Sequence, residues 1–204
     1  MKDKCLIFLL FFWSINSATV VAQDTINPKF PNIVIKTDVL MPTIGILNKP
    51  PYMLSLTAEK LFNNKHSIQI TGIYAWVNKE SRKYTTTQVI PEYKFYLLSK
   101  SQYNKFYTGI YLKITKYHDT HITNNHIGPL SWDNKTRYID YTCGFGGIIG
   151  YQIYYKKRIA LDFLVGIGGR KYIKRNIIEG TIENPDYKKI DLDGRLAINM
   201  GYKF

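Results

Sequence analysis

The sequence predicts an all-β protein, an eight-stranded antiparallel up-and-down transmembrane β-barrel whose lumen is filled with side chains. Three observations predict it: segments in which apolar and polar residues alternate, connections that are alternately long and short, and an N-terminal stretch typical of an export signal. Alternation is informative because a strand places successive side chains on opposite faces. Asp191–Phe204 shows it clearly, with Leu196 and Ile198 on one face and Asp193 and Arg195 on the other.

The first 22 residues have the pattern of a cleaved signal peptide. Met1–Lys4 is basic, Cys5–Trp13 is apolar, and small residues lead to Val20 and Ala22 at the expected cleavage site. The apolar run is far shorter than the roughly 20 residues that a membrane-spanning helix requires. We therefore expect a signal peptide at residues 1–22, a periplasmic tail at 23–32, and a barrel domain at 33–204.

Eight segments have the length and alternation of membrane strands. They are Ile33–Leu40, Tyr52–Leu61, Ser67–Val77, Thr86–Leu98, Phe106–Tyr117, Thr136–Tyr155, Ile159–Ile173 and Asp191–Phe204. Short turns follow the second, fourth and sixth segments, and longer connections such as His118–Lys135 and Lys174–Lys189 follow the others. Long loops outside and short turns in the periplasm are typical of an outer-membrane barrel. Pro91 cannot donate a hydrogen bond to a ladder, so we interpret it as a β-bulge.

The orientation of the two faces distinguishes a membrane barrel from a soluble ligand-binding barrel, whose apolar face is inside. The export signal, the terminal aromatic residue and the mixed charges of the polar face favour the membrane barrel. Because buried charges require partners, we predict ion pairs that close a narrow lumen, with glycines leaving room for long side chains. The predicted lumen charge network is Lys36, Asp38, Glu59, Glu92, Lys94, Lys113, Asp140, Asp162, Arg170, Asp193 and Arg195.

Aromatic residues near the strand ends predict the two interfacial girdles of a membrane barrel. Tyr74, Trp76 and Tyr141 are expected at the outer rim, and Tyr202 and Phe204 at the periplasmic rim. We also interpret Tyr202 and Phe204 as an assembly signal for the barrel-assembly machinery.

The formal net charge of +13 raises the possibility of a nucleic-acid partner. An exported chain instead meets the phosphates of lipopolysaccharide, so we expect no nucleic-acid partner. Lys171, Lys174 and Arg175 lie near the outer rim and are candidates for contact with outer-membrane lipid and lipopolysaccharide phosphates. Charges that only solubilise the surface are the alternative, and the loops are also candidates for contact with an unknown protein partner.

The predicted loop His118–Lys135 carries the histidines that bear on chemistry. Three imidazoles, enough for most of a metal site, come from His118, His121 and His126. No fourth ligand is evident, so metal binding stays open. With Ser131 these histidines also raise the alternative of a lipid-modifying enzyme. No compact triad is present, so we predict no catalytic residue, no cofactor and no enzymatic activity. Cys143 is expected to face lipid as a small hydrophobic residue.

Four motifs resemble a family of small bacterial outer-membrane β-barrels classed as a domain of unknown function. They are Val89–Tyr96, Phe106–Lys113, Gly146–Tyr151 and Ala160–Gly168. The resemblance spans roughly residues 33–204 and implies the barrel fold in a Gram-negative outer membrane, without implying any activity. We therefore expect a structural, adhesive or surface-binding role. The alternatives are a lipid-modifying enzyme, a small channel and a soluble ligand-binding barrel.

Overall fold

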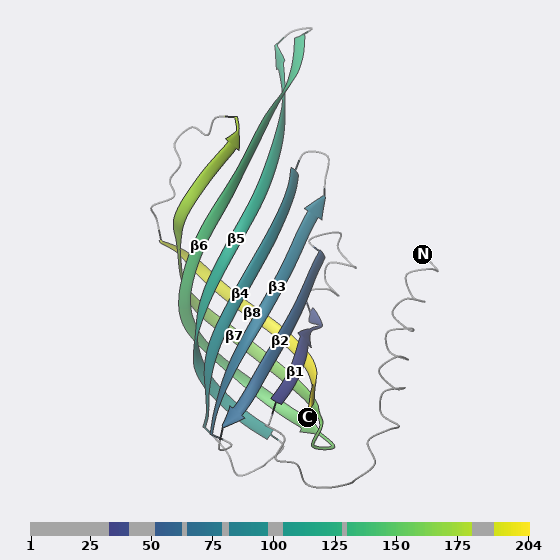
Figure 1. Cartoon of the computed structure of the whole chain (residues 1–204), viewed down its shortest axis with the longest axis vertical. Helices are drawn as coiled ribbons and strands as arrows, with labels where there is room; N and C mark the ends of the chain where they lie inside the picture. Colours follow the sequence, from purple (N-terminus) through teal and green to yellow (C-terminus); the bar gives the residue numbers. More distant parts are fainter. Residues whose placement is uncertain are drawn as a thin grey trace, which may run out of the picture. The chain divides into compact units, whose positions relative to one another are not determined.

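The computed structural model describes residues 33–40, 52–62, 65–78, 82–97, 104–127, 130–180 and 190–204. Within them, eight antiparallel strands form a closed barrel in chain order (Figure 1). The strands are β1 (Ile33–Asp38), β2 (Tyr52–Phe62), β3 (His66–Asn78), β4 (Arg82–Tyr96), β5 (Asn104–Ile127), β6 (Leu130–Tyr155), β7 (Ile159–Glu179) and β8 (Ile190–Lys203). The predicted fold class is confirmed. The predicted signal peptide, 1–22, and tail, 23–32, lie outside the described residues.

The barrel closes where the first strand meets the last. β1 pairs with β8 in a continuous antiparallel register that includes Ile35 opposite Tyr202. Beyond the strand end, the Phe204 amide donates a hydrogen bond to the Ile33 carbonyl at 3.0 Å. The seam therefore depends on the terminal residues.

None of the helical structure in the described ranges is long and apolar enough to cross a membrane.

The predicted long loops His118–Lys135 and Lys174–Lys189 are wrong where strands continue into them. The register from Asn104 opposite Ile153 continues without interruption to Ile127 opposite Leu130, so most of His118–Lys135 is strand. β7 likewise continues to Glu179, into the predicted loop Lys174–Lys189. Backbone pairing does not require apolar side chains, which is why the hairpin continues through rungs of mixed polarity above the apolar band. Figure 1 shows β5 and β6 rising beyond the other strands.

An irregularity in the β6–β7 ladder changes the direction of side chains near the upper end of β7. Tyr172 lies opposite Thr142 and Lys174 opposite Tyr141, which leaves Ile173 as an extra residue in β7. A bulge of this kind reverses the alternation beyond it. As a result Lys174 is exposed, while Arg175 turns towards the lumen and Asp140.

The bulge predicted at Pro91 is wrong. The β4–β5 ladder has Val89 opposite Ile114 and Glu92 opposite Tyr111, which is one register on both sides of the proline. Pro91 also lies opposite Ile70 in the regular β3–β4 ladder. The proline therefore removes one backbone donor without shifting the strand.

The β6–β7 turn takes an unusual backbone conformation for its residues. Lys156 and Lys157 have φ angles of 48° and 65°, and the Arg158 amide donates to the Tyr155 carbonyl at 3.2 Å. Two consecutive positive φ values are the signature of a type I′ turn, whose twist matches that of the flanking strands. Lysine adopts this region at a cost that glycine avoids.

Candidate functional site: the charged lumen and the basic outer rim

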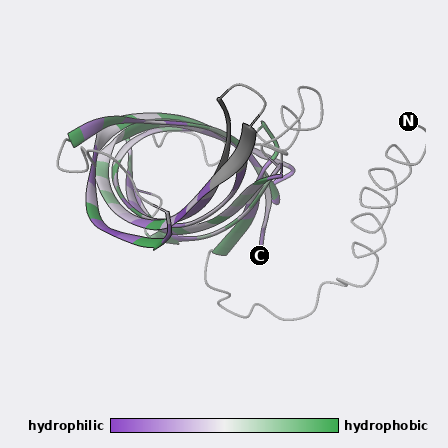
Figure 2. Cartoon of the chain, turned by 90° about the horizontal axis from the view of Figure 1, so that it is seen from above, coloured by the Kyte–Doolittle hydropathy of each residue, from purple (hydrophilic) through white to green (hydrophobic). Residues whose placement is uncertain are grey.

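The barrel has charged residues inside and apolar residues outside. Leu56 and Ile167 are each 64% exposed, whereas Lys36 and Glu59 are each 1% exposed and Asp162 is fully buried. Figure 2 shows hydrophobic and hydrophilic residues alternating along the strands that surround the lumen. A soluble ligand-binding barrel would have the opposite polarity.

Four charged side chains from four strands meet inside the lumen, within a few residues of the short turns, and we call them the central network. Lys36 Nζ of β1 lies 2.7 Å from Glu59 Oε2 of β2 and 2.6 Å from Asp162 Oδ2 of β7. Lys94 Nζ of β4 lies 2.9 Å from the same Asp162 oxygen and 3.9 Å from Glu59 Oε1. Two acids and two bases make this central network neutral, which is the arrangement that offsets the cost of removing charges from water.

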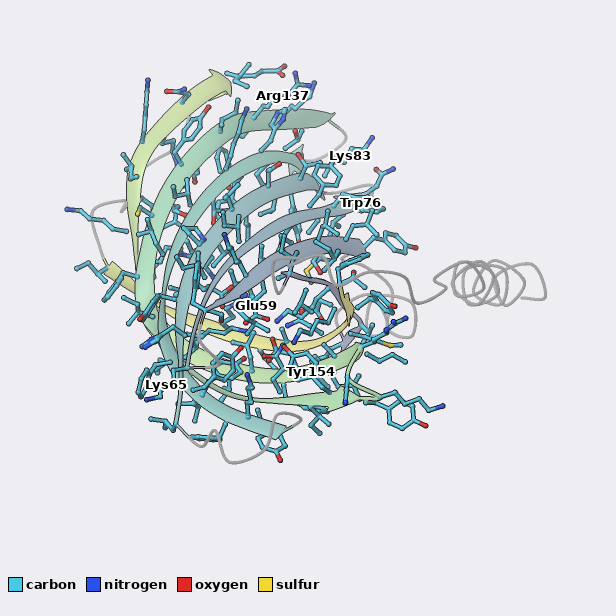
Figure 3. All side chains as sticks on the ribbon, turned by 60° about the horizontal axis from the view of Figure 1, so that its bottom comes forward. Glu59, Lys65, Trp76, Lys83, Arg137 and Tyr154 are labelled. Carbon is cyan, nitrogen blue, oxygen red and sulfur yellow. The ribbon has the colours of Figure 1, made fainter. Side chains whose placement is uncertain are left out.

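Uncharged side chains donate further hydrogen bonds to the two carboxylates of the central network. Glu59 accepts hydrogen bonds from the Ser67 hydroxyl at 2.6 Å, the Tyr96 hydroxyl at 2.7 Å and Gln152 Nε2 at 3.0 Å. Asp162 accepts one from the Tyr107 hydroxyl at 2.6 Å. The central network is therefore held by seven of the eight strands. Figure 3 shows Glu59 inside the barrel.

A second pair of ion pairs lies on the β8 side of the lumen. Arg195 Nη1 lies 2.6 Å from Glu92 Oε1, and Lys113 Nζ lies 2.6 Å from Asp193 Oδ2. The Tyr111 hydroxyl donates to Asp193 Oδ2 at 3.2 Å. These pairs connect β8 with β4 and β5 across the barrel.

Glycines opposite the buried tyrosines allow the lumen to close. A Cβ atom at Gly146 would lie 2.7 Å from the Tyr111 ring, and one at Gly150 would overlap the Tyr107 ring and the Phe163 carbonyl. Tyr107 and Tyr111 are 0% and 1% exposed. Rings of this size fill the lumen because the facing strand has no side chain there.

Near the upper end of β7, the predicted site residues divide between two roles. Arg175 forms a bidentate pair with Asp140, at 2.7 Å to Oδ1 and 2.6 Å to Oδ2. Arg175, a candidate for lipopolysaccharide contact, is therefore turned inward by the bulge and pairs with a lumen acid. Arg170 donates to the Tyr117 hydroxyl at 2.9 Å and lies 3.5 Å from the half-exposed Asp191, outside the central network.

Asp38 also differs from the other predicted network members. Its Oδ1 accepts a hydrogen bond from the backbone amide of Leu40 at 2.9 Å, and its own amide donates to the Ser55 hydroxyl at 2.7 Å. The buried carboxylate thus organises the end of β1. The sequence predicted its burial but not this local role.

The other two predicted lipid contacts lie on the outside of the barrel. Lys116 of β5, Tyr141 of β6 and Lys174 of β7 occupy one cross-strand row, and Lys171 lies opposite Cys143. Lys116, Lys171 and Lys174 are all exposed, and Lys116 Nζ lies 5.9 Å from the centre of the Tyr141 ring. We call these three lysines the basic row.

Several lumen residues were not among the predicted site. Tyr96, Tyr107 and Gln152 lie on faces that the alternation marked as polar, so that signal was available. Lys105 and Asp119 are also buried, but Lys105 fell in a predicted turn and Asp119 in a predicted loop. Their strands had to be extended before either residue could be assigned to a face.

The histidine-rich segment is strand rather than loop, which separates its residues. His118 is exposed on the outside, whereas Asp119 is 4% exposed and accepts a hydrogen bond from the Tyr138 hydroxyl. Among the described residues no group of three or more His, Cys, Asp or Glu is placed to hold a metal. The side chains of His121, His126 and Ser131 lie outside the described set.

A closed barrel with an apolar exterior and an ion-paired interior is a transmembrane β-barrel. The chain belongs to the family described as Protein of unknown function (DUF3575), whose model matches residues 6–193. This confirms the resemblance to an uncharacterised barrel family. No curated protein matches the chain.

Two solved structures are similar to this chain at low sequence identity. One is Neisserial surface protein A (NspA), with 13% identity, a TM-score of 0.49 and coverage of 85% of this chain and 95% of that chain. The other is the N-terminal β-barrel domain of Pseudomonas aeruginosa OprF, with 8% identity, a TM-score of 0.39 and coverage of 85% and 98%.

Proposed function

We propose that the protein is an integral barrel of a Gram-negative outer membrane, exported through its signal peptide, whose outer rim binds lipopolysaccharide phosphates. The distribution of charge carries the proposal. Among the described residues, the carboxylates buried in the barrel are Asp38, Glu59, Glu92, Asp119, Asp140, Asp162 and Asp193. Five of these seven, Glu59, Glu92, Asp140, Asp162 and Asp193, pair with lysines or arginines inside the barrel, so the excess of lysine and arginine lies mainly outside these ion pairs.

The position of the basic row supports a phosphate ligand. Below it on the same outer face lie apolar residues such as Ile114 and Phe145, which are 51% and 60% exposed. The bulge places Lys174 and Lys171 on the same face around the exposed Ile173. Cations directly above an apolar surface meet the headgroup phosphates of the outer leaflet. The role is therefore a membrane scaffold with a lipid-binding exterior.

The test compares two triple variants in detergent and in lipid. The first removes the basic row, as Lys116→Gln, Lys171→Gln and Lys174→Gln. The control replaces Lys60, Lys156 and Lys157, which are exposed towards the opposite rim, with Gln. We expect the first variant to bind lipopolysaccharide about tenfold more weakly in a titration, since each exposed ion pair contributes about 0.5 kcal/mol. Equal losses in both variants would overturn the phosphate role.

The alternatives remain distinct from this proposal. Absence of enzymatic activity and of a nucleic-acid partner stay predictions, as does an unknown protein partner at the extracellular side. The neutral, filled lumen supports a scaffold more than a channel. The apolar exterior supports membrane insertion more than a soluble ligand-binding role.

A further inference from the structure

A groove of about 540 Å³ lies on the outer face of the barrel across the upper ends of β2 to β5. Leu54, Tyr74 and Trp76 line its apolar part, and Lys83, His118 and Thr120 line its polar part. The strand registers bring these residues side by side, because Trp76 lies opposite Thr85 and Thr85 lies opposite His118. Lys83 lies opposite Thr120, one residue from the loop end of β4. Figure 3 labels Trp76 and Lys83 close together on this side of the barrel.

The apolar part of the groove is preorganised by its aromatic rings. Trp76 stacks on Tyr52 of β2 with ring centres 5.6 Å apart, and the tilted ring of Tyr74 lies at the same distance from Trp76. Leu54 is 62% exposed and Tyr74 is 47% exposed. Fixed rings and an open apolar wall form a surface for an extended hydrocarbon chain. The volume is within the range of 300–1,000 Å³ typical of small-molecule sites.

The polar part of the groove favours an anion. Lys83 is exposed at the top of the groove, and none of the described residues that line it is acidic. Apolar surface below and a cation above follow the order of acyl chain and phosphate in an outer leaflet. The groove faces the lipid side of the barrel, on different strand ends from Lys171 and Lys174 of the basic row.

We infer that this groove binds one phosphorylated outer-leaflet lipid, with an acyl chain along Leu54, Tyr74 and Trp76 and a phosphate at Lys83. The inference rests on the proposed function, because it requires the outer face to lie in the outer leaflet. It goes further by assigning one lipid molecule to one place on the barrel. A diffuse layer of counter-charge around the rim would not select this groove.

Trp76 serves as the probe. Replacing Trp132 with Phe leaves Trp76 as the single tryptophan after the predicted signal peptide. The variant is reconstituted in vesicles of brominated phosphatidylcholine, which quenches tryptophan in contact with lipid. A small mole fraction of unbrominated lipid A is then added. We expect recovery of fluorescence about fivefold greater than dilution of the quencher gives. Lipid A is anionic, whereas phosphatidylcholine carries a choline cation beside its phosphate, and a preference of ~1 kcal/mol at one lysine corresponds to that factor.

Two further variants define the outcome. Lys83→Gln is expected to reduce the recovery to the level of dilution, whereas Lys60→Gln, exposed towards the opposite rim, is expected to leave it unchanged. Recovery at the dilution level in the Trp132→Phe protein itself would overturn the groove and leave the membrane placement intact. Absence of quenching by brominated phosphatidylcholine would instead contradict the membrane placement. Recovery that Lys83→Gln does not reduce would overturn the phosphate assignment.

Discussion

Replacing Asp162 with Asn removes one charge from the neutral central network. Lys36 keeps Glu59 at 2.7 Å, but Lys94 loses its 2.9 Å partner and is left with Glu59 Oε1 at 3.9 Å. All four side chains are fully buried. Breaking one partner of a buried ion pair typically costs about 3–5 kcal/mol, so we expect Asp162→Asn to lower the free energy of unfolding by that amount.

The measurement is urea unfolding of the barrel in vesicles, followed by tryptophan fluorescence and by the mobility difference between unboiled and boiled samples. The double variant Asp162→Asn with Lys94→Gln restores neutrality and is expected to recover more than half of the loss. That recovery would be a favourable coupling of about 2 kcal/mol between neighbouring sites.

Asp191→Asn is the matched control. Its carboxylate is 44% exposed and lies 3.5 Å from Arg170, so solvent screens the pair and the expected cost is below about 1 kcal/mol. The reasoning would be refuted if Asp162→Asn cost no more than this control, or if the second substitution added to the loss.

Three further changes test other parts of the barrel. Gly150→Ala places a methyl group against the Tyr107 ring and backbone and is expected to cost about 1–3 kcal/mol in the same unfolding assay; an unchanged midpoint would show that the ring is not fixed there. Lys157→Gly removes the strain of a φ of 65° and is expected to add about 0.5–1 kcal/mol, whereas a loss would contradict the turn. Deleting Tyr202–Phe204 removes the end of the seam with β1 and is expected to leave export intact while blocking outer-membrane insertion; normal levels in the outer membrane would disprove it. Planar-bilayer recordings of the wild-type protein are expected to show no steady conductance, and regular current steps would contradict the closed lumen.

Alternation in the sequence predicted most of the architecture because each apolar stretch occurs on the lipid face of a strand. It identified eight strands, their outward residues and a polar lumen. It did not predict the extent of β5 and β6, whose upper rungs carry Thr, Asn and His and so resemble a loop. Above the apolar band, the polarity of a side chain no longer indicates whether its residue lies in a strand.

The partners within the lumen required the register. Lys36 and Asp162 are 126 residues apart in the chain, and only the ladders around the barrel bring them together. The bulge at Ile173 exchanged the directions of Lys174 and Arg175, which strict alternation cannot foresee. The face on which a residue lies was thus predictable from the alternation of polar and apolar residues, whereas the residue with which it interacts was not.

The central claim is that the apolar face meets lipid and the charged face is enclosed. Spin labels on single cysteines in a Cys143→Ser background test it at two adjacent pairs, Leu56 with Thr57 and Ile114 with Thr115, in which the first residue is 64% or 51% exposed and the second 1%. In vesicles, labels at Leu56 and Ile114 are predicted to be accessible to oxygen and not to a water-soluble nickel complex, while labels at Thr57 and Thr115 are protected from both. Accessibility of Leu56 and Ile114 to the nickel complex would contradict the account.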